Sequence, residues 1–174
     1  MKRIMMYVAI VLILVVTGSC EKEKRIPVNG SKGKTVDIYL HPMYQTTVGD
    51  TGEEPTMFLP TDSIIIPYSE ILGYSSEECV FYVSDKISAI LNDPENYLYQ
   101  APFSVAVDGE MIYRGFFWTR LSSATCRWPV ICIEDASGRL QVEVGYPSAP
   151  ERAPDRRNDP AILEVFRRDG KLVD

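Results

Sequence analysis

Histidine and cysteine are scarce in this chain, which limits the chemistry that its side chains can perform. The 174 residues include one histidine, His41, and four cysteines. Neither a CxxC nor an HExxH motif occurs, so the ligand spacing of common zinc sites is missing. His41 could act as the base for a cysteine or serine nucleophile, but no nucleophile elbow or papain-type cysteine accompanies it. We therefore expect no metal, no cofactor and no enzymatic activity.

Basic residues are also in the minority. Lysine and arginine total 18 against 24 acidic residues, for a formal net charge of −6. Nucleic-acid affinity depends on clustered lysine and arginine that neutralise phosphates, so we expect no nucleic-acid partner. The same balance argues against binding to anionic lipid by charge. Acidity of this size also simply keeps a surface protein soluble.

The first 19 residues combine a basic start, Lys2 and Arg3, with an uncharged and mostly apolar run. This run is short for a membrane span, which needs about 20 apolar residues, and small residues precede Cys20. The stretch resembles a bacterial lipoprotein signal with a loose lipobox at 17–20. The resemblance implies that Cys20 is the first mature residue and carries a lipid that anchors the protein to a bacterial membrane. An ordinary cleaved signal and a retained N-terminal anchor are the alternatives.

Composition divides the rest of the chain into segments. A charged stretch with glycine and serine follows Cys20 and has little to bury, which predicts a flexible tether. Four prolines within 14 residues predict an extended linker near the other end. The predicted segments are the tether at 20–34, one β-rich domain at 35–146, the proline-rich linker at 147–160 and a C-terminal hairpin or tail at 161–174.

The strongest local signal is a hairpin around Asp108 and Gly109. These two residues separate apolar runs and supply the positive φ angles that a two-residue type I′ turn requires. The pattern predicts strands over 102–107 and 110–118. A second hairpin is predicted from the apolar runs at 129–134 and 139–146.

Other segments show shorter periodic patterns. Apolar and polar residues alternate from Thr35 to His41, as in a half-buried strand. Ser84 is placed to cap a short helix over 85–92. Short strands, turn residues between them and one short helix predict a mainly β fold with minor α content, an antiparallel β-sandwich-like single domain.

The block 101–118, together with Ser122, Ser123, Cys126 and the Trp-Pro-Val-Ile stretch at 128–131, resembles a family of small uncharacterised bacterial cell-envelope lipoproteins. This resemblance implies a location in the cell envelope, with the outer membrane as the expected site of the anchor. It implies a fold but no reaction. The lipidated Cys20 is the only functional residue that it carries over.

The stretch from Met111 to Glu134 holds both tryptophans and combines apolar ends with a polar middle. The ends predict strands that supply Ile112, Val130 and Ile131 to the interior. The middle could offer hydrogen bonds beside aromatic rings, as a sugar or peptide platform does. The candidate binding residues are Arg114, Trp118, Arg120 and Trp128. The alternative is that the aromatic residues are buried on both strand faces and belong to the core.

Cys126 and Cys132 form a candidate disulfide, because an exported protein can be oxidised. Cys79 could instead pair with either of them. Three cysteines remain once Cys20 carries lipid, so any internal pairing leaves one thiol unpaired. Cysteines in apolar strands also behave as small hydrophobic residues.

Three classes of function follow. The first is a non-catalytic cell-envelope lipoprotein, an accessory or binding module for a protein or glycan partner. The second is a secreted inhibitor-like β-domain that blocks a protease with one exposed loop. The third, and least favoured, is an enzyme of unrecognised type. The shape of the loop at 119–128 separates the first two, since an inhibitor requires a protruding loop.

Overall fold

Nine strands and two α-helices account for most of the described residues, which are 33–41, 63–135, 137–149 and 155–173 of the computed structural model. The predicted leader, the lipidation site Cys20 and the tether through residue 32 lie outside them. The described residues belong to one compact unit. The strands are β1 (Val36–Leu40), β2 (Ser63–Ile66), β3 (Ile71–Ser75), β4 (Val80–Val83), β5 (Pro102–Val107), β6 (Glu110–Trp118), β7 (Val130–Cys132), β8 (Arg139–Glu143) and β9 (Leu172–Val173). The helices are α1 (Asp85–Asn92) and α2 (Pro160–Arg168), with single 3-10 turns η1 (Tyr68–Glu70) and η2 (Ile133–Asp135).

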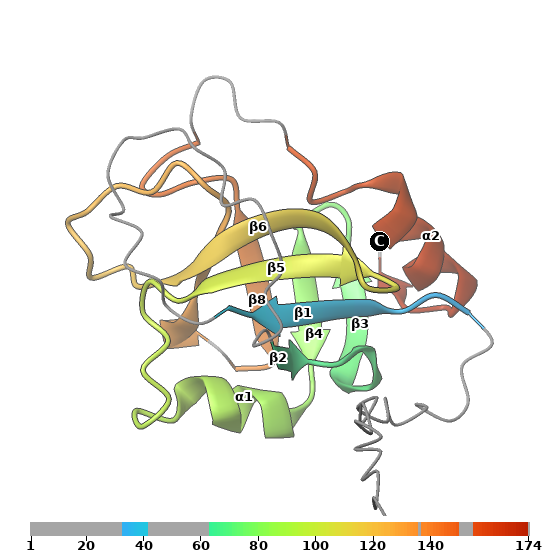
Figure 1. Ribbon diagram of the computed structural model, residues 1–174, viewed down its shortest axis with the longest axis horizontal. Helices are drawn as coiled ribbons and strands as arrows, with labels where there is room; N and C mark the ends of the chain where they lie inside the picture. Colours follow the sequence, from blue (N-terminus) through green and yellow to red (C-terminus); the bar gives the residue numbers. More distant parts are fainter. Residues whose placement is uncertain (1–32, 42–62, 136, 150–154, 174) are drawn as a thin grey trace, which may run out of the picture. The chain divides into compact units, whose positions relative to one another are not determined.

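All nine strands belong to one hydrogen-bonded sheet in the order β2-β1-β5-β6-β7-β8-β4-β3-β9. The sheet folds over on itself, so that β1, β5 and β6 run across β3, β4 and β8 (Figure 1). Residues of both halves, such as Val105 and Phe81, meet in one buried cluster. The mainly β class is therefore confirmed, although one folded sheet replaces the two sheets of a sandwich.

Two strand pairs are parallel, which differs from the antiparallel expectation. β6 pairs with β7, and β3 pairs with β9, in the parallel sense. A parallel pair needs a connection that carries the chain back to the same end of the sheet. Residues 119–129 provide this connection between β6 and β7. The connection from β3 to β9 is much longer and ends with α2. The direction of a strand relative to its neighbour is not encoded in its own period-two pattern.

The hairpin of β5 and β6 has the predicted strand bounds. Asp108 and Gly109 have φ angles of 53° and 80°, so both central residues have the positive values of a type I′ turn. The second predicted hairpin also forms, since β7 and β8 are antiparallel. Its connection contains the 3-10 turn η2.

Helix α1 has the predicted bounds and the predicted cap. The hydroxyl of Ser84 accepts a hydrogen bond from the backbone N–H of Ile87. Ile87 and Leu91 are buried in the main cluster, and Ile90 packs against it. No helix among the described residues is long and apolar enough to cross a membrane.

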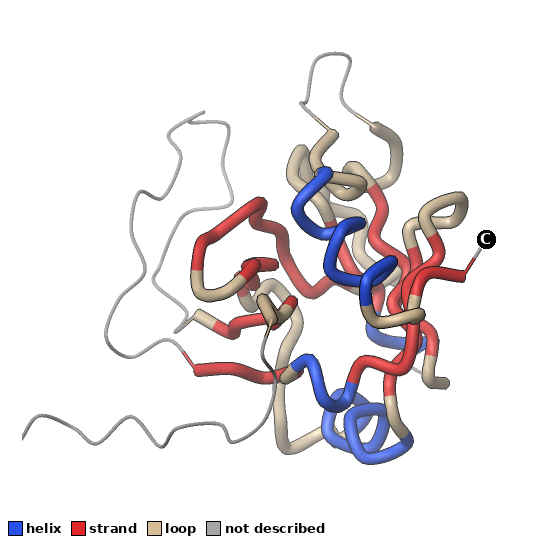
Figure 2. Tube along the Cα trace, turned by 90° about the vertical axis from the view of Figure 1, so that its right-hand side faces the viewer, coloured by secondary structure: helices blue, strands red, loops and turns tan. Residues whose placement is uncertain are grey.

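The C-terminal segment is a helix followed by a strand, so the prediction of a hairpin or tail at 161–174 was wrong. Asp159 caps α2 by accepting a hydrogen bond from the N–H of Ala161. Pro160 occupies the first turn, where a backbone N–H would have no partner within the helix, so its missing N–H costs nothing. Ile162, Val165 and Phe166 are buried in the main cluster. Figure 2 shows α2 beside the strands near the C-terminus and α1 at the bottom of the view.

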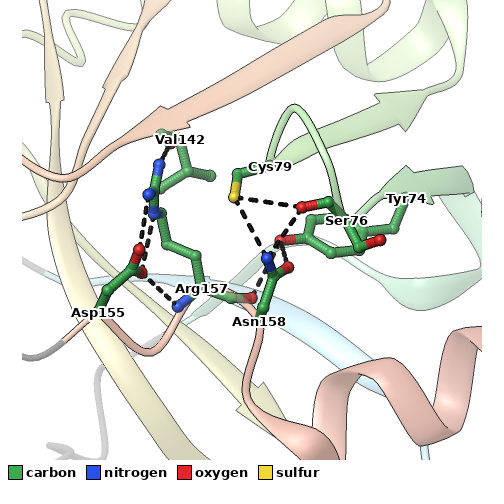
Figure 3. A network of polar contacts seen from close by, with 7 residues as sticks. All are labelled: Tyr74, Ser76, Cys79, Val142, Asp155, Arg157 and Asn158. Atoms are coloured by element: carbon green, nitrogen blue, oxygen red, sulfur yellow. Dashed lines mark hydrogen bonds and ion pairs between the residues drawn. The ribbon is translucent and has the colours of Figure 1, made fainter. Parts of the chain in front are cut away.

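Residues 155–159, called the strap below, connect to α2 and do not form a free linker. The guanidinium of Arg156 donates to the Ile112 carbonyl of β6 at 2.6 Å. That of Arg157 donates to the Val142 carbonyl of β8 at 2.7 Å (Figure 3). The strap therefore bridges two strands of the sheet.

Candidate binding site at the loop 119–128

A second, smaller cluster of buried side chains lies beneath the loop 119–128, apart from the main core. Trp118 is fully buried at its centre, and its ring centroid lies 5.4 Å from that of Tyr99 and 6.2 Å from that of Tyr146. Cys126 and Cys132 are buried in the same cluster, which also contains Val130 and is covered by Phe116 and Trp128. Trp118 is thus a buried member of this cluster, and Trp128, the last residue of the loop, packs over it.

Two tyrosines of this cluster hold the loop through their hydroxyl groups. The Tyr99 hydroxyl lies 2.8 Å from the Ser122 hydroxyl, and the Tyr146 hydroxyl donates to the Arg120 carbonyl at 2.7 Å. Cys126 and Tyr146 also exchange two backbone hydrogen bonds of 2.8 Å each. The first arm of the loop is therefore fixed to Tyr99 and Tyr146, and the second arm is fixed to Tyr146.

The loop begins with a tight turn. The N–H of Ser122 donates to the Thr119 carbonyl at 3.1 Å, and the N–H of Leu121 donates to the Thr119 hydroxyl at 3.2 Å. Glu134 accepts from the N–H of Arg120 at 2.8 Å and from the Thr119 hydroxyl. These bonds fix the backbone around Leu121.

Two large apolar side chains are exposed at this end of the domain. Leu121 is 90% exposed at the tip of the turn, and Tyr97 is 71% exposed. The Tyr97 ring lies edge-on to that of Tyr99 with 6.4 Å between centroids, and Tyr99 in turn contacts Ser122. We call the surface around the exposed Leu121 the Leu121 face.

An ion pair lies beside this face. Arg120 and Glu143 approach to 2.8 Å, and nearly half of the Arg120 side chain remains exposed. An exposed pair of this kind contributes about 0–1 kcal/mol to stability. Its main effect is to hold the Arg120 side chain against β8.

The structure separates the four predicted binding residues. Trp118 is fully buried, so the platform interpretation fails for this ring and the core alternative holds. Trp128 is half-buried over the same cluster, and Arg120 lies in the loop. Arg114 lies on β6, where its Nε is 3.0 Å from the Met111 sulfur. The interior residues predicted from the flanking strands, Ile112, Val130 and Ile131, are buried as expected.

Cys126 and Cys132 do not form the candidate disulfide, and Cys79 pairs with neither. Cys126 lies opposite Tyr146. Strand β7 ends at Cys132 and pairs with β8, with Val130 opposite Glu143 and Ile131 opposite Val142. The two cysteines therefore lie opposite different parts of the segment 141–146. Burial raises the pKa of the Cys126 thiol.

His41 does meet a serine in the fold. Its Nε2 lies 3.0 Å from the hydroxyl of Ser104, a residue of β5. Ser104 is fully buried, so its hydroxyl cannot reach a substrate. Among the described residues, no group of three or more metal-ligating side chains occurs.

Sequence reasoning missed the residues that define the face. Leu121 is an isolated apolar residue in a polar stretch, and that isolation was the available signal. Tyr99 and Tyr146 lie about 20 residues from the loop on either side, so their hydroxyl contacts could not be read from local pattern. No protein-family model, curated protein or solved structure matches this chain, so the site is interpreted from its own geometry.

Proposed function

We propose that this protein is a non-catalytic binding module of the cell envelope that holds a protein partner through the Leu121 face. One observation carries the proposal: the turn is fixed on both sides, yet it presents Leu121 almost fully to solvent. A fixed loop loses little conformational entropy when a partner binds. Burying a leucine side chain contributes about 1.5–3 kcal/mol, which is available only when a partner covers it.

The exposed groups favour a protein over a glycan. Sugar recognition by stacking needs an accessible aromatic face; of the two predicted tryptophans, Trp118 is fully buried and Trp128 is half-buried, so the exposed Tyr97 ring would have to serve without them. Leucine has no flat face to offer a sugar ring. Tyr97, which is exposed and linked to the loop through Tyr99 and Ser122, combines a large apolar surface with a hydroxyl, as interface tyrosines do.

The turn favours a binding module over a substrate-like inhibitor. A loop that mimics a protease substrate must leave its backbone N–H groups able to pair with the enzyme. Here the N–H groups of Arg120, Leu121 and Ser122 all donate within the loop or to Glu134. The loop presents Leu121 to solvent, but the three N–H groups around that residue are already paired.

The anchor is the second part of the proposal. Lipid on Cys20 and the charged tether after it would display the domain at a bacterial membrane. This part depends on the sequence resemblance alone. It is independent of the Leu121 face.

The test compares two exposed leucines in the full-length chain. A photo-crosslinking residue is placed at the exposed Ser123, and adducts formed in intact cells are compared with and without Leu121→Asp. We expect Leu121→Asp to reduce the specific adduct by about tenfold or more, which corresponds to a loss of about 1.4 kcal/mol. Leu72, which is 61% exposed on β3, provides the matched control Leu72→Asp.

Two outcomes would contradict the proposal. Equal loss with Leu121→Asp and Leu72→Asp would mean that neither leucine marks a specific face, and the absence of any adduct in the unaltered chain would mean that no partner is bound there. Unchanged thermal melting of both variants confirms that the fold is intact. A Cys20→Ala chain tests the anchor separately, since it should leave the detergent phase, and unchanged partitioning would exclude lipidation.

A further inference from the structure

Gln100 has a backbone conformation that glutamine rarely adopts. Its φ angle is 64°, and it is the third residue of a turn in which the N–H of Ala101 donates to the Leu98 carbonyl at 2.8 Å. A positive φ at this position alone is typical of a type II turn, which favours glycine there. Glycine, however, has no side chain to donate a hydrogen bond. The Gln100 amide does so, because its Nε2 donates to the Tyr99 hydroxyl at 3.2 Å.

Two more hydrogen bonds extend this contact into the turn that presents Leu121. The Tyr99 hydroxyl lies 2.8 Å from the Ser122 hydroxyl, and the N–H of Ala124 donates to Ser122 Oγ at 3.1 Å. The Tyr99 oxygen already accepts from Gln100, and a phenol is a stronger donor than an aliphatic alcohol. Tyr99 therefore donates and Ser122 accepts, so the hydrogen bonds run in one direction from Gln100 to Ser122.

A count of donors and acceptors leaves the proton of the Ser122 hydroxyl unused. A serine hydroxyl has two acceptor lone pairs and one proton to donate. In Ser122 both lone pairs are occupied, one by the Tyr99 hydroxyl and one by the N–H of Ala124. The Ser122 side chain makes no third hydrogen bond to any residue that the structure describes. Ser122 is half-buried and directly follows the exposed Leu121, so an acceptor that arrives with a partner can take this proton.

The charges around the turn favour an uncharged acceptor. Glu134 accepts from the N–H of Arg120, and the Glu143 carboxylate pairs with the Arg120 guanidinium. The positive charge of Arg120 is thus already balanced, and the whole chain has a formal net charge of −6. A carboxylate on the partner would be repelled by this surface, whereas a carbonyl oxygen would not.

We propose that Ser122 donates a hydrogen bond to a carbonyl oxygen of the protein partner that covers Leu121, and that Gln100 sets the direction of this bond through Tyr99. The inference rests on the proposed function of the Leu121 face and adds the chemistry of the partner, an apolar pocket bordered by a carbonyl group. A leucine alone fits many apolar pockets. The added bond makes the contact selective, because a partner without the acceptor would bury the Ser122 proton unpaired.

The first test removes the donor and keeps the apolar contact. Photo-crosslinking from position 123 in intact cells is repeated with Ser122→Ala, with Tyr99→Phe and with the control Thr125→Ala, which changes an exposed residue of the same loop. We expect Ser122→Ala to reduce the adduct about fivefold, because the partner's carbonyl loses its donor, and the other two changes to reduce it less than about twofold. Equal reductions in Ser122→Ala and Tyr99→Phe would mean that Ser122 only fixes the loop, and would overturn the proposal.

The second test reverses the hydrogen bonds while Ser122 stays intact. An ionised carboxylate only accepts, so in Gln100→Glu the Tyr99 hydroxyl donates to residue 100 and the Ser122 proton turns to Tyr99. We expect the adduct to fall about as far as in Ser122→Ala. Gln141→Glu, which adds the same charge at an exposed position of β8, should leave the adduct unchanged. An undiminished adduct in Gln100→Glu would overturn the directing role of Gln100.

Leu121→Asp separates failure of this inference from failure of the proposed function. An adduct that depends on Leu121 but not on Ser122 would mean that the face binds a partner without the proposed hydrogen bond. If no adduct depends on Leu121, both proposals fail. Crosslinking in washed membranes at low salt and at about tenfold higher salt should give equal adducts, because a carbonyl carries no net charge to be screened. An adduct that weakens at the higher salt would indicate a carboxylate and would overturn the choice of a carbonyl.

Discussion

Asp169 fastens the end of α2 to the rest of the domain through its carboxylate. Arg168 donates to both carboxylate oxygens at 2.7 Å, and the Tyr68 hydroxyl donates to one of them at 2.8 Å. Tyr68 itself packs edge-on against Phe166 of α2, with 5.6 Å between ring centroids. The Arg168 hydrogen bonds first, and the Tyr68 hydrogen bond second, lower the pKa of Asp169 from 3.8 to about 2.

This depressed pKa predicts an acid-dependent loss of stability. Because the folded-state pKa lies below the unfolded value, the contribution of Asp169 is fully present above about pH 4 and is lost as the pH falls toward 2. Asp169→Asn should therefore lower the free energy of unfolding at neutral pH, and this effect should shrink as the pH falls through about 2. Urea unfolding of both chains across this pH range measures the difference between their free energies of unfolding. A difference that is independent of pH would exclude the linkage. Tyr68→Phe should show a smaller loss of stability with the same dependence on pH.

The strap and α2 act together as one element that closes the sheet. α2 places Ile162, Val165 and Phe166 in the main cluster, while the strap before it reaches β6 and β8. Arg157 takes the place of a strand partner just before β4 begins. The Val142 N–H still pairs with the Cys79 carbonyl, but the Val142 carbonyl takes its donor from the guanidinium of Arg157.

Shortening this arginine should weaken the element. Arg157→Lys keeps the charge but loses the planar fork that serves Val142 and Asp155 at once, so we expect a loss of about 1–3 kcal/mol in the free energy of unfolding. Arg167→Lys is the matched control, because Arg167 is exposed in the last turn of α2. Chemical denaturation of both variants measures the difference. Equal effects would show that the Val142 contact contributes nothing specific.

Strand β6 joins the two parts of the domain, because it contributes side chains to both buried clusters. Phe117 points into the main cluster, and its neighbour Trp118 points into the smaller cluster beneath the loop. Successive side chains of a strand lie on opposite faces, so one strand couples the two. Neither cluster can lose its packing without disturbing β6.

This coupling predicts a single unfolding transition. Tryptophan fluorescence reports the smaller cluster, because Trp118 and Trp128 both lie there, while far-UV circular dichroism reports strands and helices throughout. We expect the two signals to give the same midpoint. Phe166→Ala, which removes a fully buried ring of α2, should lower both midpoints together, at a cost of about 3–5 kcal/mol. Separate midpoints would instead show two independently folding regions.

Local sequence was sufficient where short-range geometry decides the structure. The type I′ turn depends on Asp108 and Gly109 alone, and the start of α1 depends on Ser84 and the residues just after it. The same kind of signal was present for α2, in Asp159 and Pro160, but a nearby Asp-Gly pair and many prolines favoured a hairpin or tail instead.

The aromatic stretch shows what only tertiary structure decided. Phe116, Phe117 and Trp118 place apolar rings on both faces of β6, so a period-two pattern cannot tell a core face from a binding face. The fold buries Trp118 because Tyr99 and Tyr146, distant in sequence, close over it. Those same tyrosines fix the turn that exposes Leu121. Local patterns determined the turns and the short helix, whereas contacts between distant segments decided which side chains meet water.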